Sequence, residues 1–216
     1  MAYNFSGSGQ NLFSTSTPVT ATPLTLACWM NKTAATTTGI LTAIFWDGAG
    51  SWYAFYLAAG SAANGQKVGI NLANANSFGA GANATTTYTT GTWHHACGVF
   101  TSSTSRTVYM DGGNSATDTS SVTPTNLNSV NIGAARRQTV TDNYFDGSIA
   151  EVGIWDAALT QAEVGALADG MSPQLVRPQN LKVYVPLVRS TQDLKGLSFT
   201  TVGSPTVSAQ TRVYLR

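Results

Sequence analysis

The side chains best suited to binding a ligand are aromatic residues accompanied by amides in the first half of the chain. Seven residues supply this combination: Trp46, Asp47, Trp52, Tyr53, Asn74, Asn76 and Tyr88. An exposed aromatic ring flanked by amide and hydroxyl groups can hold a sugar, because the ring covers an apolar face while the polar groups bond hydroxyls. These residues form a candidate carbohydrate site, and packing in a core is the competing role for Trp46 and Trp52.

The histidine and serine residues do not form a recognisable catalytic motif. The two histidines, His94 and His95, are adjacent, and adjacent residues of a strand point to opposite faces, so they cannot bind one metal ion together. The sequence also lacks a serine-hydrolase elbow, a phosphate-binding or dinucleotide-binding glycine loop and a Cys-x-x-Cys pair. We expect one histidine to pack and the other to form a hydrogen bond across a sheet. The chain is predicted not to be an enzyme.

The elements that must position these residues are predicted to be short β-strands. Apolar or alternating runs are separated by stretches rich in Gly, Asn, Ser and Thr, which is typical of an antiparallel sandwich. The runs cover residues 24–30, 40–46, 52–57, 67–72, 93–100, 107–110, 130–133, 149–155 and 182–185. The first run alternates Leu24, Leu26, Cys28 and Met30 with Thr25, Ala27 and Trp29. Such a strand is expected to be covered on both faces.

One helix is predicted, near residues 161–169. Thr160 stands at the N-cap position with Glu163 three residues later, the spacing of a capping box. Gly170 follows the apolar residues of this segment, and Pro173 comes soon after. We expect this helix to be structural.

Composition limits the partners of the chain. Its 216 residues suit one all-β domain, and 43% of them are hydrophobic whereas 10% are charged. The net charge of +1 and the absence of any block of like charges predict no nucleic acid or membrane partner. No run reaches the roughly 18 apolar residues of a membrane span, and the first residues show no export signal. Cys28 and Cys97 fall in strand runs, and we expect buried free thiols, with a disulfide as the alternative.

Two long stretches carry a family resemblance. They are Gly91-Thr-Trp-His-His-Ala-Cys-Gly-Val-Phe100 continuing to Arg106–Gly112, and Tyr144-Phe-Asp-Gly-Ser-Ile-Ala-Glu-Val-Gly-Ile-Trp-Asp156 continuing to Leu159–Glu163. Both resemble the laminin G-like branch of the concanavalin A-like jelly rolls. The resemblance covers roughly residues 3–170 and implies an all-β antiparallel sandwich. Trp29, Trp93 and Trp155 stand in family-like strands and are therefore expected in the core.

The resemblance also suggests calcium as the one candidate cofactor. Many laminin G-like domains hold this ion, but the family pattern Gly-x-Ile-Asp-Glu-Val reads Gly147-Ser-Ile-Ala-Glu-Val152 here, with Ala150 in place of the Asp. Asp47 and Asp146 are the carboxylates left to bind calcium with help from carbonyl groups. Sugar-cleaving relatives place two Glu and an Asp close together on one strand, whereas this chain has only Glu151 and Glu163. A glycoside hydrolase is therefore disfavoured.

The chain is expected to divide into a sandwich of residues 1–173 and a C-terminal segment of residues 174–216. The run Leu181-Lys-Val-Tyr-Val-Pro-Leu187 resembles the opening strand of laminin G-like domains, although here it comes last. One alternative is a permuted strand that lies beside residues 3–5. The other is an arm that assembles with a neighbouring subunit through Leu181, Val183, Val185 and Leu187, since a strand edge can pair with another chain.

Standalone modules with such a closing segment are similar to phage decoration, head-fibre or tail-associated proteins. This similarity implies a non-enzymatic structural protein of the virion surface, made in the host cytoplasm. Its expected partners are capsid or tail proteins, further copies of itself and host-surface glycans. A stand-alone carbohydrate-binding module is the alternative function, and a glycoside hydrolase is the least favoured one.

Overall fold

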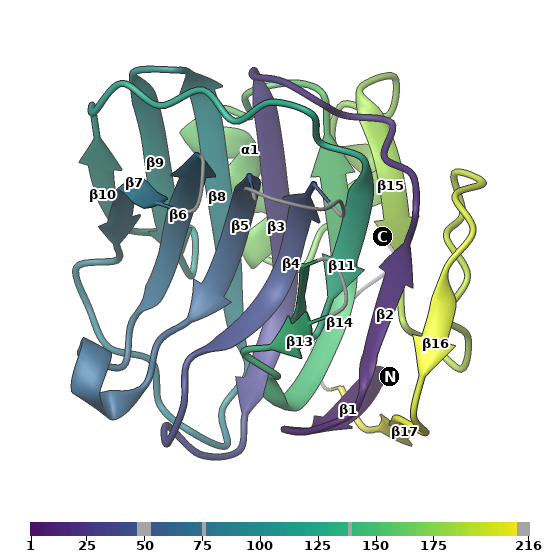
Figure 1. Cartoon of the computed structure of the whole chain (residues 1–216). Helices are drawn as coiled ribbons and strands as arrows, with labels where there is room; N and C mark the ends of the chain where they lie inside the picture. Colours follow the sequence, from purple (N-terminus) through teal and green to yellow (C-terminus); the bar gives the residue numbers. More distant parts are fainter. Residues whose placement is uncertain (47–52, 75–76, 138–139, 211–216) are drawn as a thin grey trace.

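Two antiparallel sheets pack face to face in a β-sandwich, as the sequence predicts (Figure 1). The computed structural model describes residues 1–46, 53–74, 77–137 and 140–210. Sheet A has the strand order β10 (Gly113–Asp118), β9 (Ser105–Met110), β8 (His94–Ser102), β3 (Leu24–Lys32), β14 (Asp146–Trp155), β1 (Ala2–Ser6) and β17 (Thr206–Ser208), and β15 (Leu181–Val185) also pairs with β14.

Sheet B faces the viewer in Figure 1. Its strand order is β16 (Thr200–Val202), β2 (Asn11–Ser14), β11 (Ser129–Ile132), β4 (Gly39–Phe45), β5 (Ala54–Ala59), β6 (Val68–Asn74) and β7 (Ser77–Asn83). A separate hairpin joins β12 (Ala135–Arg137) to β13 (Val140–Asp142), and two short 3-10 turns, η1 (Ala62–Asn64) and η2 (Pro173–Leu175), complete the elements. In the described ranges, no helix is long and apolar enough to cross a membrane.

Alternation along the strands builds the core between the sheets. Leu24, Leu26, Cys28 and Met30 of β3 all point inward and are buried. The rings of Phe55 from sheet B and Phe100 from sheet A meet edge to face, with their centroids 5.2 Å apart. Burial of this kind contributes about 1.5–3 kcal/mol per large apolar side chain.

The outer face of sheet A is covered by the predicted helix, α1 (Gln161–Ala168). Its capping box is present, because the hydroxyl of Thr160 accepts from the backbone N–H of Glu163, and the Glu163 carboxylate accepts from the backbone N–H of Thr160. Val164 and Leu167 pack against Trp155, which is fully buried and donates from its indole nitrogen to the carbonyl of Val176 at 2.8 Å.

The two cysteines are free and buried, which confirms the expectation of unpaired thiols. Ala27 pairs with Cys97 and Cys28 pairs with Ala96 in the β3–β8 ladder, so the two thiols belong to opposite faces of sheet A. Of the three tryptophans predicted in the core, Trp29 and Trp155 are buried. The prediction for Trp93 is wrong, since this residue is only partly buried on the outer face beside Trp29.

The C-terminal segment lies against the same chain. The first half of β14 pairs with β1, and its second half pairs with β15, so β15 continues the line of β1 instead of lying beside it. The strand beside residues 2–4 is β17. Four side chains that the arm would need, Leu181, Val183, Val185 and Leu187, are all buried in the core of this chain. Burial within the same chain leaves these four side chains little surface for contact with a neighbouring subunit, and their role in assembly stays a prediction.

Candidate functional site

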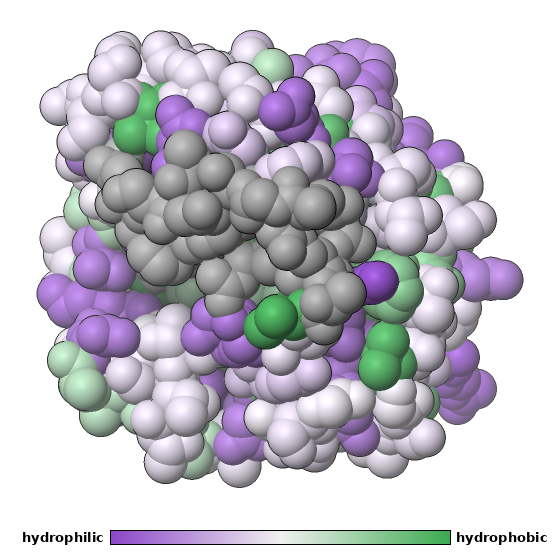
Figure 2. All heavy atoms as spheres, viewed as in Figure 1, coloured by the Kyte–Doolittle hydropathy of each residue, from purple (hydrophilic) through white to green (hydrophobic). Residues whose placement is uncertain are grey.

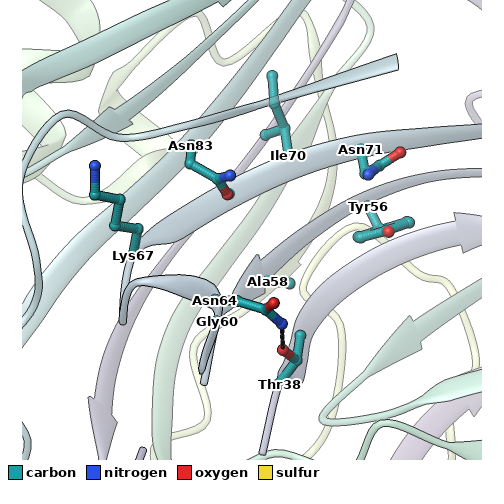
Figure 3. Close-up of a pocket in the computed structure, with 10 residues that line it drawn as sticks. Thr38, Tyr56, Ala58, Gly60, Asn64, Lys67, Ile70, Asn71 and Asn83 are labelled. Carbon is teal, nitrogen blue, oxygen red and sulfur yellow. Dashed lines mark hydrogen bonds between the residues drawn. The ribbon is translucent and has the colours of Figure 1, made fainter. Parts of the chain in front are cut away.

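A polar groove crosses the outer face of sheet B over β5, β6 and β7 (Figure 3). It has a volume of about 320 Å³ and is lined by Thr38, Tyr56, Ala58, Gly60, Asn64, Lys67, Gly69, Ile70, Asn71 and Asn83. Seen from this side, the molecule presents a mostly polar surface with scattered hydrophobic residues (Figure 2). The groove arises from strand alternation, because Val68, Ile70 and Leu72 face the core while the residues between them face outward.

Two glycines make room for the amide side chains of the groove. Gly69 lies opposite Asn83, and a Cβ atom at Gly69 would come within 2.4 Å of the Asn83 Oδ1. Gly81 lies opposite Asn71, and a Cβ atom there would come within 3.0 Å of the Asn71 Cγ and Nδ2. Each amide therefore rests across a neighbouring strand, over a position without a side chain.

Tyr56 supplies the aromatic ring of the groove. It faces outward from β5, in register with Asn71 of β6 on one side and Ala43 of β4 on the other. Its ring stacks on Phe45 with centroids 6.5 Å apart and an interplanar angle of 12°. This support from Phe45 fixes the Tyr56 ring next to the Asn71 amide.

One end of the groove is held by a hydrogen-bonded turn. The Asn64 Nδ2 donates to the Thr38 Oγ1 at 3.0 Å, and the backbone N–H of Ser61 donates to the same oxygen at 3.2 Å. Lys67 follows this turn and is the one charged residue among the described residues that line the groove. The site is thus neutral except for a single cation.

Asn71 carries a hydrogen-bond acceptor that the protein leaves unused. Its Oδ1 is buried and has no hydrogen-bond partner among the described residues. A buried acceptor without a partner costs about 1–3 kcal/mol. A rotation of the Asn71 side chain that offered this oxygen to a ligand hydroxyl would remove that cost, so the groove is suited to a ligand rich in hydroxyl groups.

The carbohydrate site predicted from the sequence falls elsewhere. Trp46 and Tyr53 form an edge-to-face pair with centroids 5.7 Å apart, and the Trp46 backbone N–H donates to the Tyr53 carbonyl at 3.1 Å. Asn74 is exposed at the end of β6. None of these three residues lines the groove. Asp47, Trp52 and Asn76 lie outside the described residues.

Tyr88 is not part of an exposed platform, and that prediction is wrong. Its side chain is 1% exposed in the core between the sheets, and its hydroxyl donates to the carbonyl of Gly60 at 2.5 Å. Burial raises the pKa of Tyr88 to about 12. Because Gly60 lines the groove, Tyr88 supports the site from below instead of touching a ligand.

The residues that the sequence interpretation missed are Tyr56, Asn71 and Asn83. Tyr56 alternates with the apolar residues Phe55 and Leu57, and Asn71 alternates with Ile70 and Leu72. This period-two pattern could have marked the residues as outward-facing. It could not have shown that they meet, because their contact depends on the pairing of three strands.

Of the two calcium candidates, only Asp146 lies among the residues that the structure describes. The residues that the structure describes contain no group of three or more His, Cys, Asp or Glu side chains suited to hold a metal ion. Asp146 begins β14, and its charge acts on the buried Lys32, whose pKa burial lowers. A cation so close would compete with calcium for Asp146. Asp47 lies outside the described residues, and calcium binding stays a prediction.

The two glutamates are engaged in structural contacts. Glu151 occupies a bulge of β14 with φ +53°, is 5% exposed and accepts from the Tyr184 hydroxyl at 2.5 Å. Burial raises the pKa of Glu151. Glu163 caps α1 and pairs with the guanidinium of Arg177 at 2.5 Å. Glu151 therefore stabilises the pairing of β15 with β14, and Glu163 stabilises α1 on the outer face of sheet A.

The adjacent histidines have the two roles expected of them. His95 is 2% exposed and packs edge to face on Trp29. His94 bonds the Asp111 carboxylate through Nδ1 at 2.7 Å, across the β8–β9 ladder.

Solved structures with the same fold come from several organisms. A pentraxin from Limulus polyphemus is 16% identical with a TM-score of 0.58, over 93% of this chain and 94% of that one. A module of the Ruminococcus gnavus IT-sialidase bound to α2,3-sialyllactose is 15% identical with a TM-score of 0.61, over 78% and 98%. Domain 4 of an arabinanase from Geobacillus stearothermophilus, in complex with arabinotriose, is 20% identical with a TM-score of 0.50, over 70% and 68%.

Sequence comparison gives the family itself. A search of the curated proteins finds no match to this chain. The model of the concanavalin A-like lectin/glucanases superfamily matches residues 5–165, from β1 to the middle of α1. This chain belongs to the concanavalin A-like lectin/glucanases superfamily.

Proposed function

We propose that this protein is a non-enzymatic carbohydrate-binding module and that the groove on sheet B is its binding site. The observation that carries the proposal is the unused Oδ1 acceptor of Asn71 beside the supported ring of Tyr56. Asn83, Thr38 and Asn64 add further amide and hydroxyl groups within the same groove.

Each part of the groove has a defined task in this proposal. The Tyr56 ring covers an apolar face of a sugar residue, and the amides of Asn71 and Asn83 exchange hydrogen bonds with its hydroxyl groups. Neutral hydrogen bonds of this kind contribute about 0.5–1.5 kcal/mol each. Their small number predicts weak binding of a single sugar and tighter binding when several copies act together.

The fold neighbours support a glycan as the ligand. Two of them are named in complex with sialyllactose and with arabinotriose. Lys67, as the one charged lining residue, favours a glycan that carries a carboxylate over a neutral one. We therefore expect a preference for acidic glycans.

The proposal is tested by screening a glycan array and then titrating the best ligand calorimetrically. Tyr56→Ala should weaken binding by about tenfold or more, since it removes the stacking ring. Tyr53→Ala is the matched control, because it removes a tyrosine that directly precedes β5 but lies outside the groove. If Tyr53→Ala abolishes binding and Tyr56→Ala does not, the site is the Trp46–Tyr53 pair. If no glycan binds, the proposal is wrong.

A place on the surface of a phage particle is proposed as the setting in which the module acts. Its support is the sequence resemblance to decoration, head-fibre and tail-associated proteins together with the low charge content of 10%. Mass spectrometry of purified particles should find the protein at a fixed copy number, and the native mass should show a closed homo-oligomer. If the protein binds glycans but is absent from every particle, the proposed place on the virion is wrong, whereas the proposed binding site in the groove is unaffected.

A further inference from the structure

A second cavity lies on the outer face of sheet A, on the opposite side of the sandwich from the groove. It has a volume of about 630 Å³ and is lined by Trp29, Gly91, Thr92, Trp93, His94, Asp111, Ala168 and Asp169. None of these residues lines the groove on sheet B. A ligand in this cavity would therefore be independent of the proposed glycan.

The end of α1 forms one wall of this cavity. α1 packs on the turn after β9, where a Cβ atom at Gly112 would come within 3.2 Å of both Gly165 and Ala168. Gly112 has φ +74°, so the turn needs glycine for its backbone as well as for this close approach. The contact brings Asp169, the C-cap of α1, and Asp111 to the same cavity.

Two indole rings form the apolar part of the cavity. Trp29 is 4% exposed and is fixed by an edge-to-face contact with His95, with centroids 5.5 Å apart. Trp93 is partly buried and packs against the cluster that contains Trp29. Indole faces carry negative electrostatic potential and attract weakly hydrated cations.

Hydrogen bonds from His94 and His95 stabilise the negative charge of Asp111. The His94 Nε2 accepts from the backbone N–H of Thr89 at 3.0 Å, so this nitrogen carries no proton. The Nδ1 therefore holds the proton of a neutral imidazole and donates it to Asp111 at 2.7 Å. The backbone N–H of His95 donates to the other Asp111 oxygen at 2.8 Å. Burial raises the pKa of Asp111, but these hydrogen bonds and the attraction of the two histidines outweigh it and hold the pKa below its ordinary value.

The lining of the cavity is thus anionic. Asp111 and Asp169 each bring a negative charge, and the lining contains no lysine or arginine from the described part of the chain. The C-terminus of α1 adds the negative end of a helix dipole at Ala168 and Asp169. Two carboxylates beside indole rings suit a hard metal ion poorly, because calcium takes six to eight oxygen ligands. An anion would be repelled.

We propose that this cavity binds an organic cation of the alkylammonium class, with the cationic group against the indole rings of Trp29 and Trp93 and between the carboxylates of Asp111 and Asp169. Contact with an indole face contributes about 0.5–1 kcal/mol at an exposed site and about 2 kcal/mol or more once the cation is desolvated. The two carboxylates favour a positively charged ligand, whereas the indole rings favour an alkylated ammonium group over a small, strongly hydrated cation.

The test uses the full chain and choline as the probe, with its neutral carbon analogue, in which a quaternary carbon replaces the nitrogen, as the matched ligand. Tryptophan fluorescence or NMR should show saturable binding of choline and binding at least about tenfold weaker for the neutral analogue. Equal binding of the two ligands, or no binding of choline, would overturn the proposal. Binding of neutral oligosaccharides in place of choline would also overturn it.

Variants locate the site. Trp93→Ala should weaken choline binding by about tenfold or more, and Asp169→Asn, which is nearly isosteric and exposed, by about threefold or more. Asp169→Asn keeps the test valid if Trp93→Ala folds poorly. Tyr56→Ala should leave choline affinity unchanged while it weakens glycan binding, so failure of one proposal is distinguishable from failure of the other. Choline binding that survives both cavity variants would refute the site.

Discussion

The two faces of this sandwich are built from the same alternation of residues but have opposite coverings. α1 and the segment around η2 cover part of the outer face of sheet A. Cys97, Val99 and Trp155 pack beneath them, and a cavity lies beside the end of the helix. The outer face of sheet B is open at β5–β7, and its outward residues are a tyrosine, two amides and glycines. The covered outer face of sheet A carries two carboxylates at the edge of its covering, whereas the open outer face of sheet B offers mainly neutral hydrogen-bonding groups.

This comparison suggests that the two sites depend on different parts of the fold. The anionic cavity needs the docking of α1, because Ala168 and Asp169 belong to its lining. The groove needs only the register of three neighbouring strands and the turn at Thr38 and Asn64. Changes in the covering of sheet A should therefore damage one site before the other.

The largest effect is expected from Trp155→Ala. Trp155 is fully buried beneath α1 and donates to the Val176 carbonyl, so truncation should cost about 3–5 kcal/mol in the free energy of unfolding, measured with denaturant. Trp93→Ala is the control and should cost about 1 kcal/mol, because Trp93 is only partly buried. In the folded Trp155→Ala protein, choline binding should weaken while glycan binding persists. Equal weakening of choline binding and glycan binding would contradict the expectation that the two sites depend on different parts of the fold.

The next largest effect is expected on the free energy of unfolding when the pH is lowered. Burial lowers the pKa of His95 to about 4 from the ordinary 6.5, so the folded state resists protonation that the unfolded state accepts. Stability from neutral His95 is present above pH 6.5 and is lost as pH falls toward 4, by roughly 3 kcal/mol in total. Denaturant titrations across this range should show the loss in the native protein and a smaller loss in His95→Phe, which keeps a ring on Trp29.

Glu151 has the opposite effect to His95 on the change of stability with pH. Its raised pKa means that the folded state holds a proton more tightly than the unfolded state, so its contribution favours folding as the pH falls. The difference between the native protein and His95→Phe cancels this term. Identical pH profiles for the two proteins would show that His95 is not the titrating group. The lining residues that the structure describes for the groove include no carboxylate or histidine, so glycan affinity should change little in folded protein.

The sandwich and the helix could be predicted because their signals are local. Period-two alternation marks β3 over Leu24–Met30, and Thr160 with Glu163 marks the start of α1, so neither requires knowledge of distant contacts. The separate roles of His94 and His95 also follow from local geometry, because adjacent strand residues face opposite ways.

The groove could not be predicted because it depends on long-range register. Tyr56, Asn71 and Gly81 become neighbours only when β5, β6 and β7 pair with particular residues opposite one another. Tyr88 illustrates the converse, since nothing in its Thr-rich surroundings signals that its ring enters the core. Sequence identifies which face a strand residue takes, but pairing decides which residues share a site.

A smaller effect is expected from Gly69→Ala on the open face. The new Cβ atom would meet the Asn83 Oδ1, a flexible side-chain end, so the Asn83 amide should move at little cost in stability. Glycan affinity should fall by about threefold to tenfold through the loss of one hydrogen bond. Gly113→Ala, with nothing within 4 Å of its Cβ, is the matched control. Unchanged glycan affinity in Gly69→Ala would show that the Asn83 amide does not bind the glycan.

The smallest effect should come from Lys67→Met, which keeps most of the length of the side chain and removes the charge that the described lining residues bring to the groove. An exposed charge pair contributes about 0.2–1 kcal/mol, so affinity for a sialylated glycan should fall by about twofold to fivefold while affinity for its neutral counterpart stays the same. Raising the salt concentration should reproduce the change in the native protein and leave Lys67→Met unaffected. Equal losses for both glycans would mean that Lys67 acts through its alkyl chain, and the open face would then select its ligand by neutral contacts alone.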